Sequence, residues 1–322
     1  MDNRFTEILE AYDLDIHNIS RTRGAFLLDT SKGLKLLKCL EGSEKRVHLE
    51  NEITAFLYTN GFEKVDCLVP NKEGEWITKS AAGEKYYIKN WFWGEGFEPK
   101  DKEKAVEGAG VLGRVHKILE NLELSEELIR KEPLVESLEK HTREMRRVRA
   151  YVRSKKQKNE LEAAMLEHYN MFYEKAVTAL EMLGKLDYEE HKVTHGSFTY
   201  HNVLFYNNRN TGVVNFDRAA VGFQITDLYY YLRKVMEKND WSVVLGRRLL
   251  EEYQKNCEIG EKQWEMLSLL MIYPEKYWKI CNHYYNTKKC WIAGRSMDKL
   301  EAVCRQENKK ERFLKEVFSL SI

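Results

Sequence analysis

The chain has 322 residues with 52 basic and 51 acidic side chains, a formal net charge of +1. This near balance argues against wholesale nucleic-acid binding, and the length predicts about two domains. The first residues lack a basic region followed by an apolar run, and no stretch reaches ~18 apolar residues, so we expect no secretory signal, no membrane span and synthesis in the cytoplasm.

The first third of the chain predicts a small antiparallel sheet. Residues 16–28 and 33–40 alternate apolar and polar positions, and the turn-rich segment 29–33 separates them as in a hairpin. Period-two alternation places Leu36, Lys38 and Leu40 on one face of the second strand. Lys38 is therefore a candidate for a lysine that reaches a bound phosphate. The alternative is a lysine at a strand edge that extends into solvent.

Residues 44–60 change to helical periodicity, with Gly61 as a stop signal. Extending the apolar stripe towards the start of this helix reaches Glu50, whereas Glu52 lies off it. Glu50 is therefore the better candidate to pair with Lys38, although either acid remains open. The alternative is that both glutamates simply solvate a surface helix.

A second hairpin is predicted from residues 75–78 and 85–92, and its last strand runs into a segment with two glycines, residues 93–96. Such a break predicts either a hinge whose backbone meets an adenine edge or a plain surface turn. No G-x-G-x-x-G motif precedes it. We expect one lobe over residues 1–94 and a second, mostly helical lobe over residues 95–322.

The second lobe should contain helices at 105–119, 134–156 and 160–183, the last closed by Gly184. Residues 143–158 contain eight basic side chains against one acid, which predicts a solvated helix face or, alternatively, a docking patch for an acidic partner. Asp227 lies near the first turn of a further helix, where a carboxylate favours the helix dipole. More helices follow from Trp241 onward. The predicted fold class is α+β.

Two short strips contain the candidate chemistry. Residues 195–205 begin His-Gly-Ser and include Asn202, and residues 213–217 end Asn-Phe-Asp. In kinases the first strip supplies a catalytic aspartate and a magnesium-binding asparagine, and the second supplies a magnesium-binding aspartate. Ser197 and Asn215 occupy the two acid positions. A neutral hydroxyl is not a general base near pH 7, and an amide is a poorer magnesium ligand than a carboxylate.

The remaining residues of the strips have other predicted roles. His195 is expected to brace the loop through hydrogen bonds. A serine hydrolase centred on Ser197 is disfavoured because no G-x-S-x-G elbow surrounds it. Asp217 is two residues from Asn215 and would share its face on a strand, so it would substitute in part as a metal ligand.

The order of these pieces resembles the aminoglycoside phosphotransferase and choline kinase superfamily. Within it the chain looks most like the spore coat CotS family of endospore-forming Firmicutes, through the strips and the long stretches 227–238, 273–279, 284–286 and 291–292. The resemblance implies a two-lobed, protein kinase-like fold. The superfamily motif H-G-D-x-x-x-x-N maps its base to Ser197 and its metal-binding asparagine to Asn202, and the later metal aspartate maps to Asn215.

The resemblance and the two missing acids together predict a structural or assembly protein of the spore coat with a degenerate, pseudokinase site. The alternatives are an active or weakly active phosphotransferase for a small molecule or protein, and a scaffold that binds ATP without cleaving it. ATP and magnesium are the cofactors that the resemblance implies, with Lys38 and Glu50 at the nucleotide and Asn202, Asn215 and Asp217 at the metal. Other coat proteins are the implied partners, with synthesis in the mother cell and deposition in the coat.

Overall fold

The computed structural model describes residues 5–22, 24–131, 133–206, 210–286 and 293–320. The chain forms two compact units. One consists of Met1–Lys131, His191–Tyr231 and Glu252–Cys257, and the other of Glu132–Glu190, Leu232–Glu251 and Glu258–Ile322. The lobe boundary at residue 94 stays a prediction. In the described ranges no helix is both long and apolar enough to cross a membrane.

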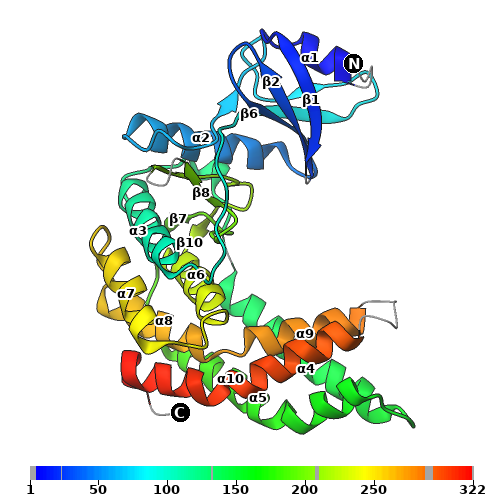
Figure 1. The fold of residues 1–322 in the computed structure, drawn as a ribbon, viewed down its shortest axis with the longest axis vertical. Coiled ribbons are helices and arrows are strands. Elements are labelled where there is room, and N and C mark those ends of the chain that lie inside the picture. Colours follow the sequence, from blue (N-terminus) through cyan, green and yellow to red (C-terminus); the bar gives the residue numbers. More distant parts are fainter. Residues whose placement is uncertain (1–4, 23, 132, 207–209, 287–292, 321–322) are drawn as a thin grey trace. The chain divides into compact units, whose positions relative to one another are not determined.

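An antiparallel sheet forms the N-terminal part of the first unit (Figure 1). Its strand order is β1 (Ile16–Thr22), β2 (Ala25–Thr30), β3 (Lys35–Cys39), β6 (Lys85–Asn90) and β4 (Leu68–Val69), and β5 (Thr78–Lys79) also pairs with β6. The single strand predicted over 16–28 is wrong, because the chain turns at Gly24, whose φ is +70°, and splits it into β1 and β2. The predicted hairpins at 29–33 and before β6 are confirmed.

Helices cover both faces of this sheet. The short helix α1 (Thr6–Glu10), which the pattern did not predict, packs Ile8 against Leu37 and Ile88 on one face. Helix α2 (Glu44–Thr59) packs Val47 against Leu68 and Tyr87 on the other. The predicted helix at 44–60 is thus confirmed, and it ends before Gly61, whose φ is +88°.

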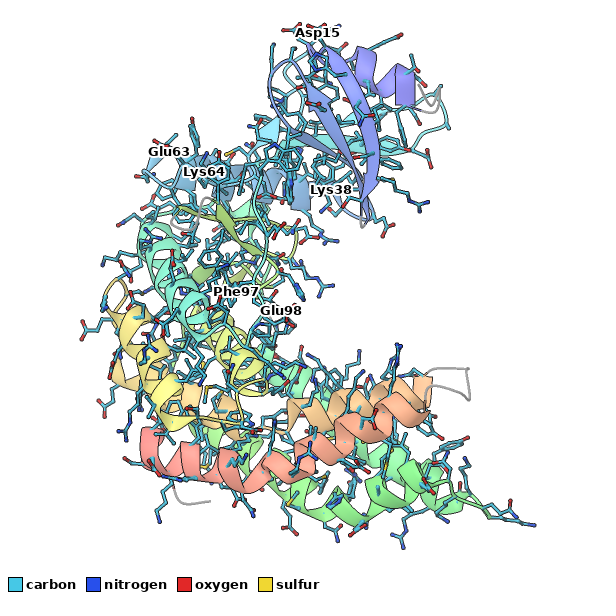
Figure 2. All side chains as sticks on the ribbon, in the orientation of Figure 1. Asp15, Lys38, Glu63, Lys64, Phe97 and Glu98 are labelled. Atoms are coloured by element: carbon cyan, nitrogen blue, oxygen red, sulfur yellow. The ribbon has the colours of Figure 1, made fainter. Side chains whose placement is uncertain are left out.

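The face covered by α2 also contains the lysines of β3 and β6. The register pairs Lys38 with Tyr87 and Leu36 with Lys89, and directly opposed residues share a face. Leu36 and Lys38 therefore lie on the same side, as the alternation predicted, and Figure 2 labels Lys38 at the end of the sheet next to α2. This register places two lysines from neighbouring strands above one helix.

The remainder of the first unit positions the two strips. The strands β7 (Lys192–Thr194) and β10 (Ala220–Gly222) pair antiparallel, as do β8 (Val203–Tyr206) and β9 (Asn210–Val213). The first strip runs from β7 to β8, and the second runs from β9 to β10. Thr194 of β7 is the register partner of Ala220 of β10. The residues after Thr194 and the residues before Ala220 therefore leave the sheet next to each other.

Two helices complete the setting of the strips in the first unit. Helix α3 (Lys102–Leu119) contains the helix predicted at 105–119 and begins with Asp101 as its cap. Helix α6 (Ile225–Met236) begins beside the second strip, and its Tyr231 hydroxyl donates a hydrogen bond of 2.7 Å to the carbonyl of Ala105. This bond joins α6 to α3.

The second unit is helical. It contains α4 (Leu134–Ser154), α5 (Glu160–Lys185), α8 (Glu261–Ile272), α9 (Glu275–Asn286), α10 (Ala293–Phe318) and most of α7 (Val243–Gln254). The helices predicted at 134–156 and 160–183 are confirmed, but the predicted stop at Gly184 is wrong, since α5 continues through it. Trp291 and Ile292, which contributed to the resemblance, lie outside the described residues.

Candidate functional site

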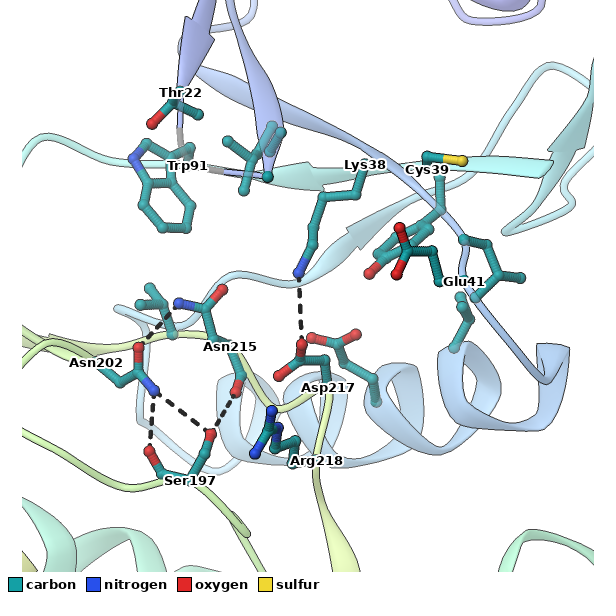
Figure 3. A pocket seen from close by; sticks show the side chains of 18 of the residues that line it. Thr22, Lys38, Cys39, Glu41, Trp91, Ser197, Asn202, Asn215, Asp217 and Arg218 are labelled. Carbon is teal, nitrogen blue, oxygen red and sulfur yellow. Dashed lines mark hydrogen bonds and ion pairs between the residues drawn. The ribbon is translucent and has the colours of Figure 1, made fainter. Parts of the chain in front are cut away.

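A cleft of about 990 Å³ opens in the first unit between the sheet, α2 and the two strips (Figure 3). Apolar side chains from the sheet and the strips line part of it, and charged side chains line the rest. The structure brings six of the seven predicted site residues to this cleft: Lys38, Glu50, Ser197, Asn202, Asn215 and Asp217. The seventh, His195, is fully buried beside it.

Lys38 and Asp217 face each other across the cleft. Their Nζ and Oδ2 atoms are 3.8 Å apart, and the side chains are 16% and 38% exposed, so both remain accessible to a ligand. Arg46 of α2 fixes the backbone at this point, because its Nη2 and Nε atoms donate hydrogen bonds of 2.8 and 3.3 Å to the Asp217 carbonyl. The alternative of Lys38 as a solvent-facing strand lysine is therefore wrong.

The predicted pairing of Glu50 with Lys38 is also wrong. Glu50 is buried and forms an ion pair with Lys89, which also pairs with the buried Asp66. Glu52 is exposed and does not take the Lys38 position either. Burial of a lysine is favourable only where carboxylates compensate its charge. Lys89 lies on β6, the strand next to β3, and is more deeply buried than Lys38.

Asp66, which is paired with Lys89, also supports the second strip. Asp66 accepts a hydrogen bond of 3.0 Å from the backbone N–H of Asn215, whose φ of +68° is the left-handed conformation that asparagine tolerates. Burial raises the pKa of Asp66 to about 6, against the opposing effect of Lys89. The sequence predictions did not include Lys89 and Asp66, although a lysine directly after the apolar run of residues 86–88 was a usable signal.

Ser197, Asn202 and Asn215 bond to one another as neutral groups (Figure 3). The Asn202 amide donates to the carbonyl of Ser197 at 3.0 Å, and the Asn215 amide donates to Asn202 Oδ1, also at 3.0 Å. The Ser197 hydroxyl lies 3.5 Å from the Asn215 carbonyl. The side-chain oxygen that a metal would use on Asn202 therefore already accepts a hydrogen bond from the Asn215 amide.

His195 braces the first strip, as predicted. Its Nε2 lies 3.1 Å from the Val214 carbonyl, and its Nδ1 lies 3.3 Å from the backbone N–H of Ser197. These contacts suit a neutral ring that donates through Nε2 and accepts at Nδ1. Burial lowers the pKa of His195, which keeps the ring neutral. The histidine joins the two strips and does not face the cleft.

Asp227 fixes the backbone at the start of the first strip. Its buried carboxylate accepts hydrogen bonds from the backbone N–H groups of His195 at 2.6 Å and Gly196 at 2.9 Å, and it lies 3.3 Å from Nε2 of the buried His116. At Gly196, φ is +72° and an added Cβ would lie 2.0 Å from the Arg218 carbonyl. The sequence predicted only a helix-dipole role for Asp227.

The segment predicted as a hinge does not offer its central peptide groups to a ligand. Glu95 pairs with Phe205 of β8 through two backbone hydrogen bonds of 3.2 and 2.9 Å. At Gly94 an added Cβ would lie 3.1 Å from Leu204 Cβ, so the segment packs directly on the strand. The prediction that this backbone meets an adenine edge is wrong at Glu95, and Trp91 is the nearby residue that lines the cleft.

The cleft fits a nucleoside triphosphate better than it fits a pair of magnesium ions. Its volume is in the range of small-molecule sites, ~300–1,000 Å³, and Leu27, Leu36 and Val214 supply apolar walls. Magnesium is usually held by one or two carboxylates together with substrate phosphates. Glu50 is already paired with Lys89. Of the other two acids that line the cleft, Glu41 and Asp217, the one that faces Lys38 is Asp217. Among the described residues, no three His, Cys, Asp or Glu side chains group as a metal site.

The two lysines above α2 should respond differently to the same substitution. Lys89→Met leaves two carboxylates buried without a cation and should lower the free energy of unfolding by about 3 kcal/mol. Lys38→Met removes a partly exposed pair and should cost less than about 1 kcal/mol. Urea denaturation of both variants measures this. Equal losses would contradict the assignment of Lys89 as structural and Lys38 as ligand-facing.

Comparison with known proteins identifies the fold around this site. The model of the family described as "Spore coat putative kinase YutH" matches residues 6–317. An aminoglycoside phosphotransferase from Alicyclobacillus acidocaldarius subsp. acidocaldarius DSM 446 superimposes with a TM-score of 0.81 at 16% identity, covering 96% of this chain and 93% of that one. Comparison with curated proteins gives no match.

Two further solved structures have the same fold. Spectinomycin phosphotransferase APH(9)-Ia, in complex with ADP and spectinomycin, has a TM-score of 0.65 at 15% identity and covers 97% of this chain and 93% of that one. Amicoumacin kinase hAmiN, in complex with AMP-PNP, Ca²⁺ and Ami, has a TM-score of 0.66 at 12% identity and covers 98% and 94%. The predicted α+β, kinase-like fold and the resemblance to the superfamily are confirmed.

Proposed function

Because the chain belongs to the spore coat YutH family, a CotS-like group of kinase-like proteins, we propose that it is a coat component that binds ATP in this cleft and transfers phosphate weakly or not at all. The observation that carries the proposal is the contrast within the cleft. Lys38 and Asp217 face open space, whereas Ser197, Asn202 and Asn215 satisfy one another.

The retained half of the site supports nucleotide binding. Lys38 approaches from β3, and Arg218 also lines the cleft, so basic groups are available for phosphates. The solved phosphotransferases with this fold include complexes with ADP and with AMP-PNP. ATP bound by this chain would place its base against the apolar wall and its phosphates towards Lys38.

Ser197 and Asn215 support the part of the proposal that says catalysis is weak or absent. Loss of a general base alone removes roughly 10²- to 10⁴-fold in rate. Loss of a magnesium carboxylate at Asn215 weakens neutralisation of the transferring phosphoryl group as well. Ser197 and Asn215 together therefore favour a role other than rapid phosphoryl transfer. Membership of the spore coat family supports a role in coat assembly, for which we infer other coat proteins as partners, synthesis in the mother cell and deposition in the coat.

One observation favours a second candidate, a slow ATP-dependent phosphotransferase. Asp217 is the acid that faces the cleft beside Lys38 at 3.8 Å, and it would hold one magnesium ion with Asn202 after that amide exchanges its partner. In that case turnover would require Asp217 and Asn202. Loss of ATP hydrolysis in Asn202→Ala and Asp217→Ala would support this candidate, and hydrolysis unaffected by both would exclude it.

Binding of AMP-PNP with magnesium tests the main proposal. At 100 times its dissociation constant the nucleotide should stabilise the protein by about 2.7 kcal/mol, measured as a shift in melting temperature and checked by titration calorimetry. Lys38→Met should abolish the shift, whereas Lys32→Met, in the turn between β2 and β3 and 57% exposed, should leave it unchanged. No shift in the wild type would overturn the proposal that the cleft binds ATP. Rapid ATP turnover would overturn the proposal that phosphoryl transfer is weak or absent.

A further inference from the structure

A strongly basic groove lies in the second unit, and it shares no lining residue with the nucleotide cleft. Helix α4 and helix α5 form an open groove of about 740 Å³, and the lining residues include five arginines and two tyrosines: Arg143, Arg146, Arg147, Arg149, Arg153, Tyr169 and Tyr173. The whole chain is almost neutral, but residues 143–158 contain eight basic side chains and one acidic one. The other residues of the chain are therefore net negative, and the excess of positive charge lies in residues 143–158.

The arginines of the groove are largely uncompensated. Arg143 forms a long, exposed ion pair with Glu139 at 3.5 Å, which contributes little. In the part of the chain that the structure describes, the other four arginines form no ion pair with a carboxylate, and the acid within the run, Glu144, accepts a hydrogen bond from Trp278 at 2.8 Å. Like charges three and four residues apart on a helix repel one another, so an anionic ligand would relieve this repulsion.

The floor of the groove argues against single-stranded nucleic acid that stacks its bases on Tyr169. The Arg149 guanidinium covers the Tyr169 ring at 4.4 Å, and the rings of Tyr169 and Tyr173 stack at 5.1 Å. Single-stranded nucleic acid needs exposed aromatic faces on which bases stack. Here the Tyr169 ring is buried at 3% exposure between a cation and another ring.

The spacing of the arginines argues for an extended ligand rather than a single small anion. From Arg143 to Arg153 the helix rises about 15 Å, and successive arginines along one face lie about 5–6 Å apart. Acidic side chains at alternate positions of an extended peptide lie about 6.6 Å apart on one face. An acidic peptide can therefore meet several arginines in turn, whereas one phosphate cannot.

We propose that this groove on α4 and α5 binds an acidic, Glu- or Asp-rich segment of a partner protein. The proposal does not depend on ATP binding or phosphoryl transfer, because none of the groove residues lines the nucleotide cleft. Binding should weaken steeply with salt, since the contacts are exposed ion pairs that dissolved ions screen.

The test is fluorescence anisotropy of a dye-labelled peptide of alternating glutamate and serine, added to the full-length protein. The variant Arg146→Gln/Arg147→Gln/Arg153→Gln should raise the dissociation constant at least about tenfold. The matched control, Lys185→Gln/Lys299→Gln/Arg305→Gln, removes three exposed charges from the same unit and should change it less than about twofold. Circular dichroism confirms that both variants are folded, and the substitutions keep Arg149 on Tyr169.

Three outcomes would overturn the proposal. The first is no salt-sensitive binding of the glutamate peptide by the wild type. The second is an equal loss in both variants, which would indicate a general charge effect. The third is binding of inorganic polyphosphate or anionic phosphatidylserine vesicles at concentrations where the peptide does not bind, which would assign the groove to another ligand class.

Discussion

Replacement of Ser197 by Asp together with Asn215 by Asp is expected to raise the rate of ATP turnover by at least about 10²-fold. The first change supplies a general base on the strip that Asp227 already holds in place. The second supplies a magnesium carboxylate at position 215, where the backbone N–H donates a hydrogen bond to Asp66. Aspartate also tolerates the left-handed backbone at position 215. Release of ADP from ATP and magnesium, with and without added acceptor, measures the gain.

The control for this variant changes only the charge at the base position. Ser197→Asn with Asn215→Asp places a side chain of the same size as aspartate beside Asn202 but provides no base, and its turnover should stay well below that of the double acid. Lys38→Met in the double-acid background should remove the gain. If the double-acid variant folds and binds AMP-PNP but turns over no faster than the wild type, the missing acids are not what limits catalysis.

Replacement of Asp227 by Ala is expected to lower the free energy of unfolding by about 4 kcal/mol. The carboxylate is fully buried and accepts two short backbone hydrogen bonds. Its removal therefore leaves the buried N–H of His195 and the partly buried N–H of Gly196 without acceptors, at about 1–3 kcal/mol for a buried group. The His116 ring also loses its partner at 3.3 Å. Urea denaturation measures the loss.

A second aspartate in the same unit is the matched control. Asp13 is 86% exposed and pairs with Lys32, so Asp13→Ala should cost less than about 1 kcal/mol. Asp227→Asn distinguishes charge from hydrogen bonding, because its amide retains one acceptor and should recover part of the loss. A cost for Asp227→Ala no greater than that for Asp13→Ala would show that the loop holds its conformation without this carboxylate.

Local pattern predicted most of the helices because their signals are carried by neighbouring residues. Apolar stripes located α2 and α3, and the start and length of α4 followed from the same spacing. The turn at Gly24 was missed because residues 16–28 keep a strand-like alternation through it, and alternation does not record a reversal of chain direction. The short helix α1 has too few residues to show a helical period.

The site was predicted where the relation between residues was local and mispredicted where it crossed elements. Lys38 was placed correctly on its face, since alternation along one strand decides that. Its partner was not, because Lys38 and Lys89 lie on the same side of the sheet above the same helix, and the register and depth of packing determine which of them Glu50 reaches. Asp66 belongs to a segment without periodicity, so no pattern indicated it.

The sequence by itself determined the two strips and which residues they contain, with Ser197, Asn202, Asn215 and Asp217 among them, because these depend only on residue identity and spacing. Only the tertiary structure decided what each group faces. Packing against α2 buries Lys89 with two carboxylates and leaves Lys38 beside Asp217 at an open cleft. A charge is buried only where opposite charges can surround it, and residues far apart in the chain supply those charges.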